Sequence, residues 1–343
     1  MKQSRLIATT ALVATAGIAN AEVAVSGAAK AGLVYNSEGG EKTRLLSSAT
    51  VIFDATGETD GGMTFGFNAN IIVTNNGSVD NDDTTVYMSG AFGKLSFGAV
   101  AEADEQAGLS DIGWDGLDVD DIAEAFVGDE LGDFLDTFNA TGRSGSISLG
   151  HNVNYTYVAG PLTLSLSGQL PTSNSVDNVD SYAAGMKYSF GDFYAGLGYA
   201  DHSVLASNLG LSGGNPSGPT QIDANVTSLF GGGSFGAIKV AALYSDLNVK
   251  IDGTKGSGDA YGMNVSYTMD ALTVSLGAGR SEIKGLGKQS SLGLGAAYNL
   301  GGGASISGGI ARIKDDSFSS AFADENDFGT SETRADIGVK FSF

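Results

Sequence analysis

Apolar and polar residues alternate over the last eleven positions of the chain, from Thr333 to Phe343. Every second residue from Ala335 onward is apolar, and the residues between are charged, polar or glycine. Successive side chains of a β-strand point to opposite faces, so the pattern predicts a strand with one apolar and one polar face. The same period of two recurs at Leu162–Leu170 and at Tyr261–Thr268. The sequence therefore predicts an all-β protein.

The alternating segments predict sixteen strands, many about 9 to 11 residues long, which is the length a tilted strand needs to cross a bilayer core. We expect the strands to begin near residues 22, 42, 62, 84, 94, 144, 162, 180, 192, 222, 236, 259, 271, 287, 303 and 332. A closed barrel of that many strands encloses water rather than a packed core. The predicted fold is a 16-stranded antiparallel transmembrane β-barrel.

Short and long connections alternate along the predicted strands. The short ones carry aromatic residues, as in Tyr188–Phe193, Tyr267–Leu272 and Tyr298–Gly303. Such residues favour a girdle at a membrane interface, although aromatic hairpins of a soluble sandwich are the alternative. The long connections are predicted at Asn75–Asp83, Pro171–Val179, His202–Thr220, Ile251–Gly258 and Asp315–Ser331.

The first 21 residues have the pattern of a secretory signal peptide. Lys2 and Arg5 precede an apolar run, Leu6–Ile18, and small residues follow at Ala19-Asn20-Ala21. We predict a signal peptide over residues 1–21 and a single barrel domain over residues 22–343. No later run of about 18 apolar residues occurs, which excludes a helical membrane protein.

Composition narrows the function further. Residues 22–343 hold 16 basic and 39 acidic residues, a net charge of −23, which argues against nucleic acid as a partner. Cysteine is absent, which excludes disulfides, thiol catalysis and thiolate metal sites. His151 and His202 are the only histidines, and neither lies in a nucleophile motif. We therefore expect a protein that is not an enzyme.

One predicted connection is much longer than the others. Residues Ala101–Gly142 hold 13 acids, no base and the only tryptophan, Trp114. Four of the acids, Asp115, Asp118, Asp120 and Asp121, supply the hard oxygen ligands that Ca²⁺ prefers, although their spacing is not that of an EF-hand. A structural calcium site and a solvated acidic loop are the two interpretations.

Three bases near the start of the predicted barrel carry the opposite charge. By strand parity Lys30, Lys42 and Arg44 point into the lumen. If the acidic loop folds inward, its acids would face these bases across a narrow gap and favour cations mildly; the alternative is ordinary pairing between neighbouring strands. The candidate constriction acids are Glu102, Asp104, Glu105, Asp111, Asp115, Asp118, Asp120 and Asp121.

Four sequence blocks carry a family resemblance: Glu22-Val23 with Ser26-Gly27, Ser89–Lys94, Tyr298–Ile306 and Asp336–Phe343. With them the chain resembles the sixteen-stranded general-diffusion porins of alphaproteobacterial outer membranes, over essentially all of residues 22–343. The resemblance implies a homotrimer and a third loop folded inside each barrel. Lys30, Lys42 and Arg44 match the family's basic wall positions, whereas the acids of the loop cannot be matched one for one.

The function that the resemblance implies is passive diffusion of ions and small hydrophilic solutes across the outer membrane of a Gram-negative cell. Outer-membrane lipid and lipopolysaccharide would surround the barrel, and the barrel-assembly machinery would recognise Phe343. No cofactor is required, with calcium as the candidate structural ion. The alternatives are a barrel selective for one substrate and a secreted β-rich structural protein, for which the expected fixed-period repeat is not seen.

Overall fold

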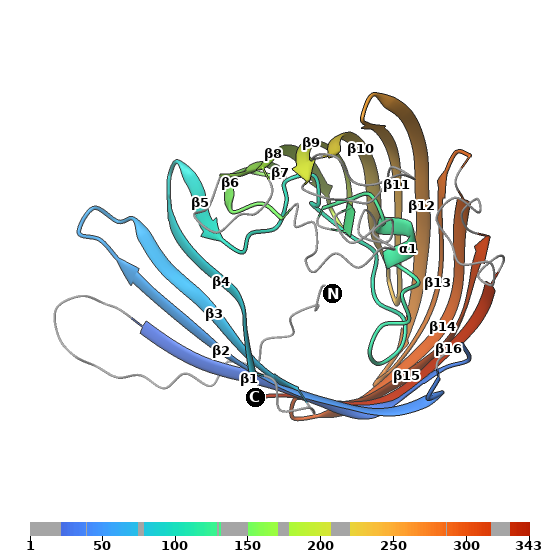
Figure 1. Cartoon of the computed structure of the whole chain (residues 1–343). Helices are drawn as coiled ribbons and strands as arrows, with labels where there is room; N and C mark the ends of the chain where they lie inside the picture. The colour runs from blue at the N-terminus through green and yellow to red at the C-terminus, as the bar shows by residue number, and fades with distance from the viewer. Residues whose placement is uncertain are drawn as a thin grey trace.

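The computed structural model of the chain is a closed antiparallel β-barrel (Figure 1). It describes residues 22–38, 40–74, 79–128, 130–131, 150–170, 178–206, 220–285, 287–316 and 330–343. The predicted signal peptide, residues 1–21, lies outside these residues and stays a prediction. Across the described ranges, no helix has the length and the apolar run that crossing a bilayer requires.

Sixteen strands and one short helix make up the regular structure of the described residues. Each strand is hydrogen-bonded to the next in chain order, and β1 pairs with β16 to close the barrel. The elements are β1 (Glu22–Asn36), β2 (Thr43–Glu58), β3 (Thr64–Thr74), β4 (Val79–Gly90), β5 (Gly93–Gly98), α1 (Asp121–Glu124), β6 (Val153–Ala159), β7 (Leu162–Gln169), β8 (Asn178–Phe190), β9 (Phe193–Ala206), β10 (Thr220–Phe235), β11 (Ile238–Ile251), β12 (Thr254–Met269), β13 (Leu272–Ile283), β14 (Gly287–Gly301), β15 (Ala304–Asp316) and β16 (Thr330–Ser342).

The pair β1 and β16 is called the seam here, because it joins the two ends of the sheet. Its register places Lys30 opposite Lys340 and Gly32 opposite Gly338. Beyond the last residue of β16, Phe343 and Gly27 exchange two backbone hydrogen bonds, of 2.7 and 2.9 Å. The predicted terminal strand is thus confirmed as the closing strand of the barrel.

The alternation read from the sequence separates the outer from the inner face of the wall. Large apolar side chains such as Leu166, Leu292 and Ile337 stay exposed on the outside, where lipid can cover them. At the end with the short turns, the ring of Phe193 packs against those of Phe190 and Phe235, at centroid distances of 5.9 and 4.7 Å. This aromatic group lies where the sequence predicted a girdle.

Several predicted boundaries are wrong, and the hairpin of β11 and β12 shows why. A long connection was expected over Ile251–Gly258, yet the two strands continue to a two-residue turn, with Ile251 opposite Thr254. Asp252 and Gly253 in that turn have φ values of 46° and 89°. Asp-Gly is a preferred sequence for the tight hairpin turn that needs two positive φ values, so the polar residues beside it belong to strands.

Three other strands also differ in extent from the prediction. β4 begins at Val79, within the connection predicted at Asn75–Asp83, and a register shift near Asn68 accompanies it. β9 continues through His202 to Ala206, so His202 belongs to the wall. The strand expected from Ser144 begins at Val153, and residues 132–149 lie outside the described part of the chain.

Candidate functional site

The described part of the connection between β5 and β6, residues 99–128, 130–131 and 150–152, lies inside the barrel and is called the inner loop here (Figure 1). Its helix α1 contacts β11 to β14. Loop residues Ala103, Phe126 and Leu131 are buried against an apolar patch of the inner wall. The wall residues of that patch are Ala183, Ala200, Val204, Ile222, Ala224, Val226, Leu247, Val249, Ala260 and Ile283. The hydrophobic core of the protein therefore lies between loop and wall.

Glycines of the wall let the inner loop approach the sheet closely. A methyl group on Gly185 would lie 1.7 Å from the carbonyl oxygen of Ala103, and one on Gly262 would lie 2.4 Å from the Cβ atom of Ala123. Further wall glycines whose added Cβ would meet the loop within about van der Waals distance are Gly198, Gly258, Gly277, Gly279, Gly293, Gly295 and Gly309. Much of the glycine content of the strands thus serves this contact.

The tip of the inner loop, residues 110–120, is seated on the seam by Trp114. Its side chain is fully buried, and an added Cβ on Gly338 would lie 2.3 Å from its ring. The indole N–H donates to the carbonyl oxygen of Val339 at 3.1 Å. One carboxylate oxygen of Asp336 accepts the backbone N–H groups of Trp114 and Asp115, both at 2.7 Å. These contacts hold the loop across the lumen.

Opposite charges meet at this seat. Asp115 forms an ion pair with Lys30 of β1, and Asp118 forms one with Arg334 of β16. The ammonium group of Lys30 also lies 5.5 Å from the centroid of the Trp114 ring, within the range of a cation–π contact. Arg334 and Lys340, a neighbour of Lys30 across the seam, were not singled out as site residues. The inward parity of β16 was the signal that could have found them.

The eight predicted constriction acids occupy different environments. Glu102, Asp104 and Asp120 are buried, and Glu105 and Asp121 are half-buried. Burial, with repulsion from Asp121 and Asp111, raises the pKa of Asp120 to about 8. Asp111 is exposed, whereas Asp115 and Asp118 are held by the two seam bases. The structure therefore brings only Asp111, Asp115 and Asp118 together at the exposed side of the tip.

The two other predicted bases lie apart from these ion pairs. Arg44 of β2 is opposite Val34, on the face of the sheet that carries Lys30, and Lys42 directly precedes β2. Both are exposed. Among the described residues, neither forms an ion pair with an acid of the inner loop. Both add positive charge at the start of β2.

The four acids considered for calcium do not share one environment. Lys30 and Arg334 hold Asp115 and Asp118, while Asp120 is buried and Asp121 begins α1. Calcium would have to compete with two basic side chains, and the raised pKa of Asp120 disfavours its ionised form. Calcium binding at these residues stays a prediction.

The first residues of the inner loop are fixed beside its last ones. The backbone N–H of Ala103 donates to the hydroxyl of Ser167 at 2.7 Å, and the amide of Asn154 donates to the carbonyl of Ala101 at 2.9 Å. Glu102 lies near His151 and His202, a cluster that the sequence gave no reason to expect. The inner loop is thus attached to the wall at its tip and at its two ends.

Comparison with known proteins places these features in context. The family described as Gram-negative porin matches residues 8–317. A porin of Rhodobacter capsulatus is 31% identical over 342 residues, which cover 94% of this chain and 100% of that protein.

Solved porin structures have a similar fold. A porin structure refined at 1.8 Å resolution has a TM-score of 0.66 and 27% identity, over 94% of this chain and 100% of that one. The anion-selective porin from Comamonas acidovorans has a TM-score of 0.70 at 17% identity, with coverage of 94% and 100%. The trimer form of an outer membrane protein from Vibrio cholerae has a TM-score of 0.69 at 14% identity, with coverage of 94% and 99%. The last two share the fold alone.

Proposed function

This chain belongs to the Gram-negative porins and forms an outer-membrane channel, and we propose that its inner loop, seated on the seam, sets the aperture and ion preference of that channel. The observation that carries the proposal is the attachment of the loop tip to the seam. Trp114 and Asp336 hold the tip against the wall, so the loop narrows the lumen. Ions and small hydrophilic solutes then pass by diffusion through the remaining gap.

The charges beside the tip support a weak preference for cations. The seam bases Lys30 and Arg334 are paired with Asp115 and Asp118, which leaves Asp111 exposed on the loop. The net charge of −21 adds a negative background. Lys42 and Arg44 oppose it. Because three of the candidate acids are buried, the preference is weaker than the acid count of the loop implies.

Charge substitutions test this proposal in a planar bilayer under a salt gradient. Neutralising Lys30, Lys42 and Arg44 together with glutamine should shift the reversal potential toward stronger cation preference. A unit charge about 10 Å from an ion in water is worth about 0.4 kcal/mol, which is roughly a twofold change in local ion concentration for each charge.

The matched substitution of opposite sign is Asp111→Asn, which should shift the reversal potential the other way. Asp120→Asn is the control, because a buried acid with a raised pKa contributes little charge at pH 7. An unchanged reversal potential in the triple variant would place these bases away from the narrow part of the channel.

We also propose that this chain assembles as a homotrimer. The relative from Vibrio cholerae is described in a trimer form. We extend a homotrimer to this chain, with outer-membrane lipid and lipopolysaccharide against the exposed apolar face. Phe343, exposed at the end of the closing strand, would be the residue that the barrel-assembly machinery recognises. Bilayer conductance that rises in groups of three steps supports the trimer.

A further inference from the structure

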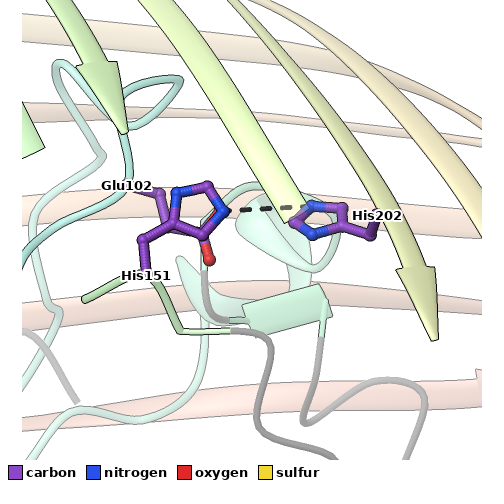
Figure 2. Close-up of side chains that lie close together, drawn as sticks. All are labelled: Glu102, His151 and His202. Carbon is purple, nitrogen blue, oxygen red and sulfur yellow. Dashed lines mark ion pairs between the residues drawn. The ribbon is translucent and has the colours of Figure 1, made fainter. Parts of the chain in front are cut away.

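The only two histidines of the chain lie close to each other, one in the inner loop and one in the wall (Figure 2). His151 lies just before β6, and His202 lies on the inner face of β9. Their ring centroids are 6.0 Å apart, and both side chains are almost fully buried. The carboxylate of Glu102, at the start of the inner loop, lies beside both rings. The fold thus brings two histidines that are far apart in sequence together with a carboxylate at one buried position.

The spacing of the three groups suits an ion better than direct hydrogen bonds. One oxygen of Glu102 lies 3.8 Å from Nε2 of His151 and 4.0 Å from Nε2 of His202. A direct hydrogen bond needs about 3 Å. Each residue offers one ligand atom, and these three atoms lie within 4.8 Å of one another. Tetrahedral ligands at about 2.0 to 2.1 Å from zinc are roughly 3.4 Å apart, so the ligand atoms would have to move together by up to about 1.4 Å to complete the site.

The other ring nitrogens are oriented by serines. Nδ1 of His151 lies 2.6 Å from the hydroxyl of Ser167, and Nδ1 of His202 lies 2.6 Å from the hydroxyl of Ser181. Metal-binding histidines commonly donate their second N–H to an oxygen in this way, which leaves the lone pair of Nε2 for the ion. Nε2 of His202 is buried and has no hydrogen-bond partner, and it faces Glu102.

Ser181 makes one further contact that an ion would change. Its hydroxyl lies 2.5 Å from Nε2 of His151, and it can donate its proton there. If an ion bound Nε2 of His151, the hydroxyl proton of Ser181 would turn away from that nitrogen. The Ser181 oxygen would then accept a hydrogen bond from Nδ1 of His202 alone. The neutral imidazole is the form that binds metals.

We propose that Glu102, His151 and His202 form a buried site for a divalent transition-metal ion of the zinc type. Two imidazoles and one carboxylate are a ligand set of zinc, whereas calcium prefers oxygen ligands alone. Glu102 follows β5 by four residues, and His151 precedes β6 by two. The ion would therefore tie both ends of the inner loop to β9 of the wall.

Cobalt(II) tests the site, because tetrahedral cobalt absorbs visible light and substitutes for zinc. The full barrel is refolded in detergent after treatment with a chelator and titrated with Co²⁺, then with Zn²⁺. Since the chain has no cysteine and no other histidine, an imidazole-ligated signal has one source. We expect one Co²⁺ for each chain, displaced by Zn²⁺, and at least a tenfold loss of affinity in His151→Gln, His202→Gln and Glu102→Gln.

Asp111→Asn is the matched control, because it removes an exposed acid of the same loop and should bind cobalt like the native chain. The absence of a tetrahedral cobalt spectrum in the correctly folded native barrel overturns the proposal, whether or not the variants fold. Unchanged binding in the double variant His151→Gln, His202→Gln also overturns it, because the ion would then sit on surface carboxylates. X-ray absorption at the zinc edge that shows two imidazole ligands supports it.

Discussion

Asp111 and Asp120 lie on the same tip of the inner loop, yet water reaches only one of them. Asp111 is exposed, and Asp120 is buried with a pKa raised to about 8. The sequence identifies both as acids of a long acidic loop, and nothing local distinguishes them. Their roles are decided by which side of the loop packs on the wall. The residue scale is therefore where prediction from the sequence was weakest.

The raised pKa of Asp120 predicts a specific pH dependence. Between pH 4 and pH 8 the folded chain keeps a proton on Asp120 that the unfolded chain releases, so folding stability should fall as pH rises through that window. The slope is about 1.4 kcal/mol for each pH unit. Asp120→Asn lacks this proton, and its stability relative to the native chain should grow from pH 4 to pH 8.

Denaturant unfolding at several pH values, followed by tryptophan fluorescence, measures this difference. Trp114 is the only tryptophan and is buried at the seat, so its emission reports docking of the tip. Asp111→Asn should keep the native trend over a narrower pH window, because Asp111 is one of the charges that raise the pKa of Asp120. Parallel curves for the native chain and Asp120→Asn would show that Asp120 is ionised in the folded protein.

Strands were the elements that the sequence predicted best. An alternating strand records its two faces in its own residues, so sixteen strands could be located without knowledge of their neighbours. The errors arose where a second signal was present. Asp252-Gly253 marks a tight turn, and polar residues around it were assigned to a loop instead. In β10 the alternation is strong, and the face with Ile222, Ala224 and Val226 is buried under the inner loop, whereas Gln221, Asp223 and Asn225 share the opposite face.

The contact between the tip and the seam depends on a position without a side chain. Gly338→Ala would place a methyl group 2.3 Å from the Trp114 ring, so the indole must move. We expect a loss of about 1 to 3 kcal/mol, typical of overpacking, and a red shift of tryptophan emission as the ring meets water.

Gly168→Ala is the matched control for this substitution. Gly168 faces outward on β7, and its added Cβ would meet only the carbonyl oxygen of Ser181, at 3.3 Å. The emission of this variant should equal that of the native chain. A Gly338→Ala barrel with native emission and stability would mean that Trp114 does not rest on the seam.

At the scale of the whole molecule, the sequence predicted a barrel around water, and the structure adds a core inside it. The apolar inner wall from β8 to β13 is covered by the inner loop, and the gap that remains is bordered by the seam and its ion pairs. The pairing of Glu102 with two distant histidines could not be predicted, because it depends on how the two ends of the inner loop pack over β7 to β9. Alternation within each strand therefore predicts the barrel wall, whereas the size of the channel depends on how the inner loop packs on that wall.

The permeation of uncharged sugars of increasing size into lipid vesicles tests the central claim most directly. The native channel should admit the smallest sugars and exclude larger ones steeply. A Trp114→Ala, Asp336→Ala double variant removes the indole and the carboxylate that hold the tip, so its size limit should rise while the barrel still resists heat and detergent. Identical size dependence in the two proteins, or no entry of the smallest sugar through the native barrel, would contradict a channel whose aperture is set by the seated loop.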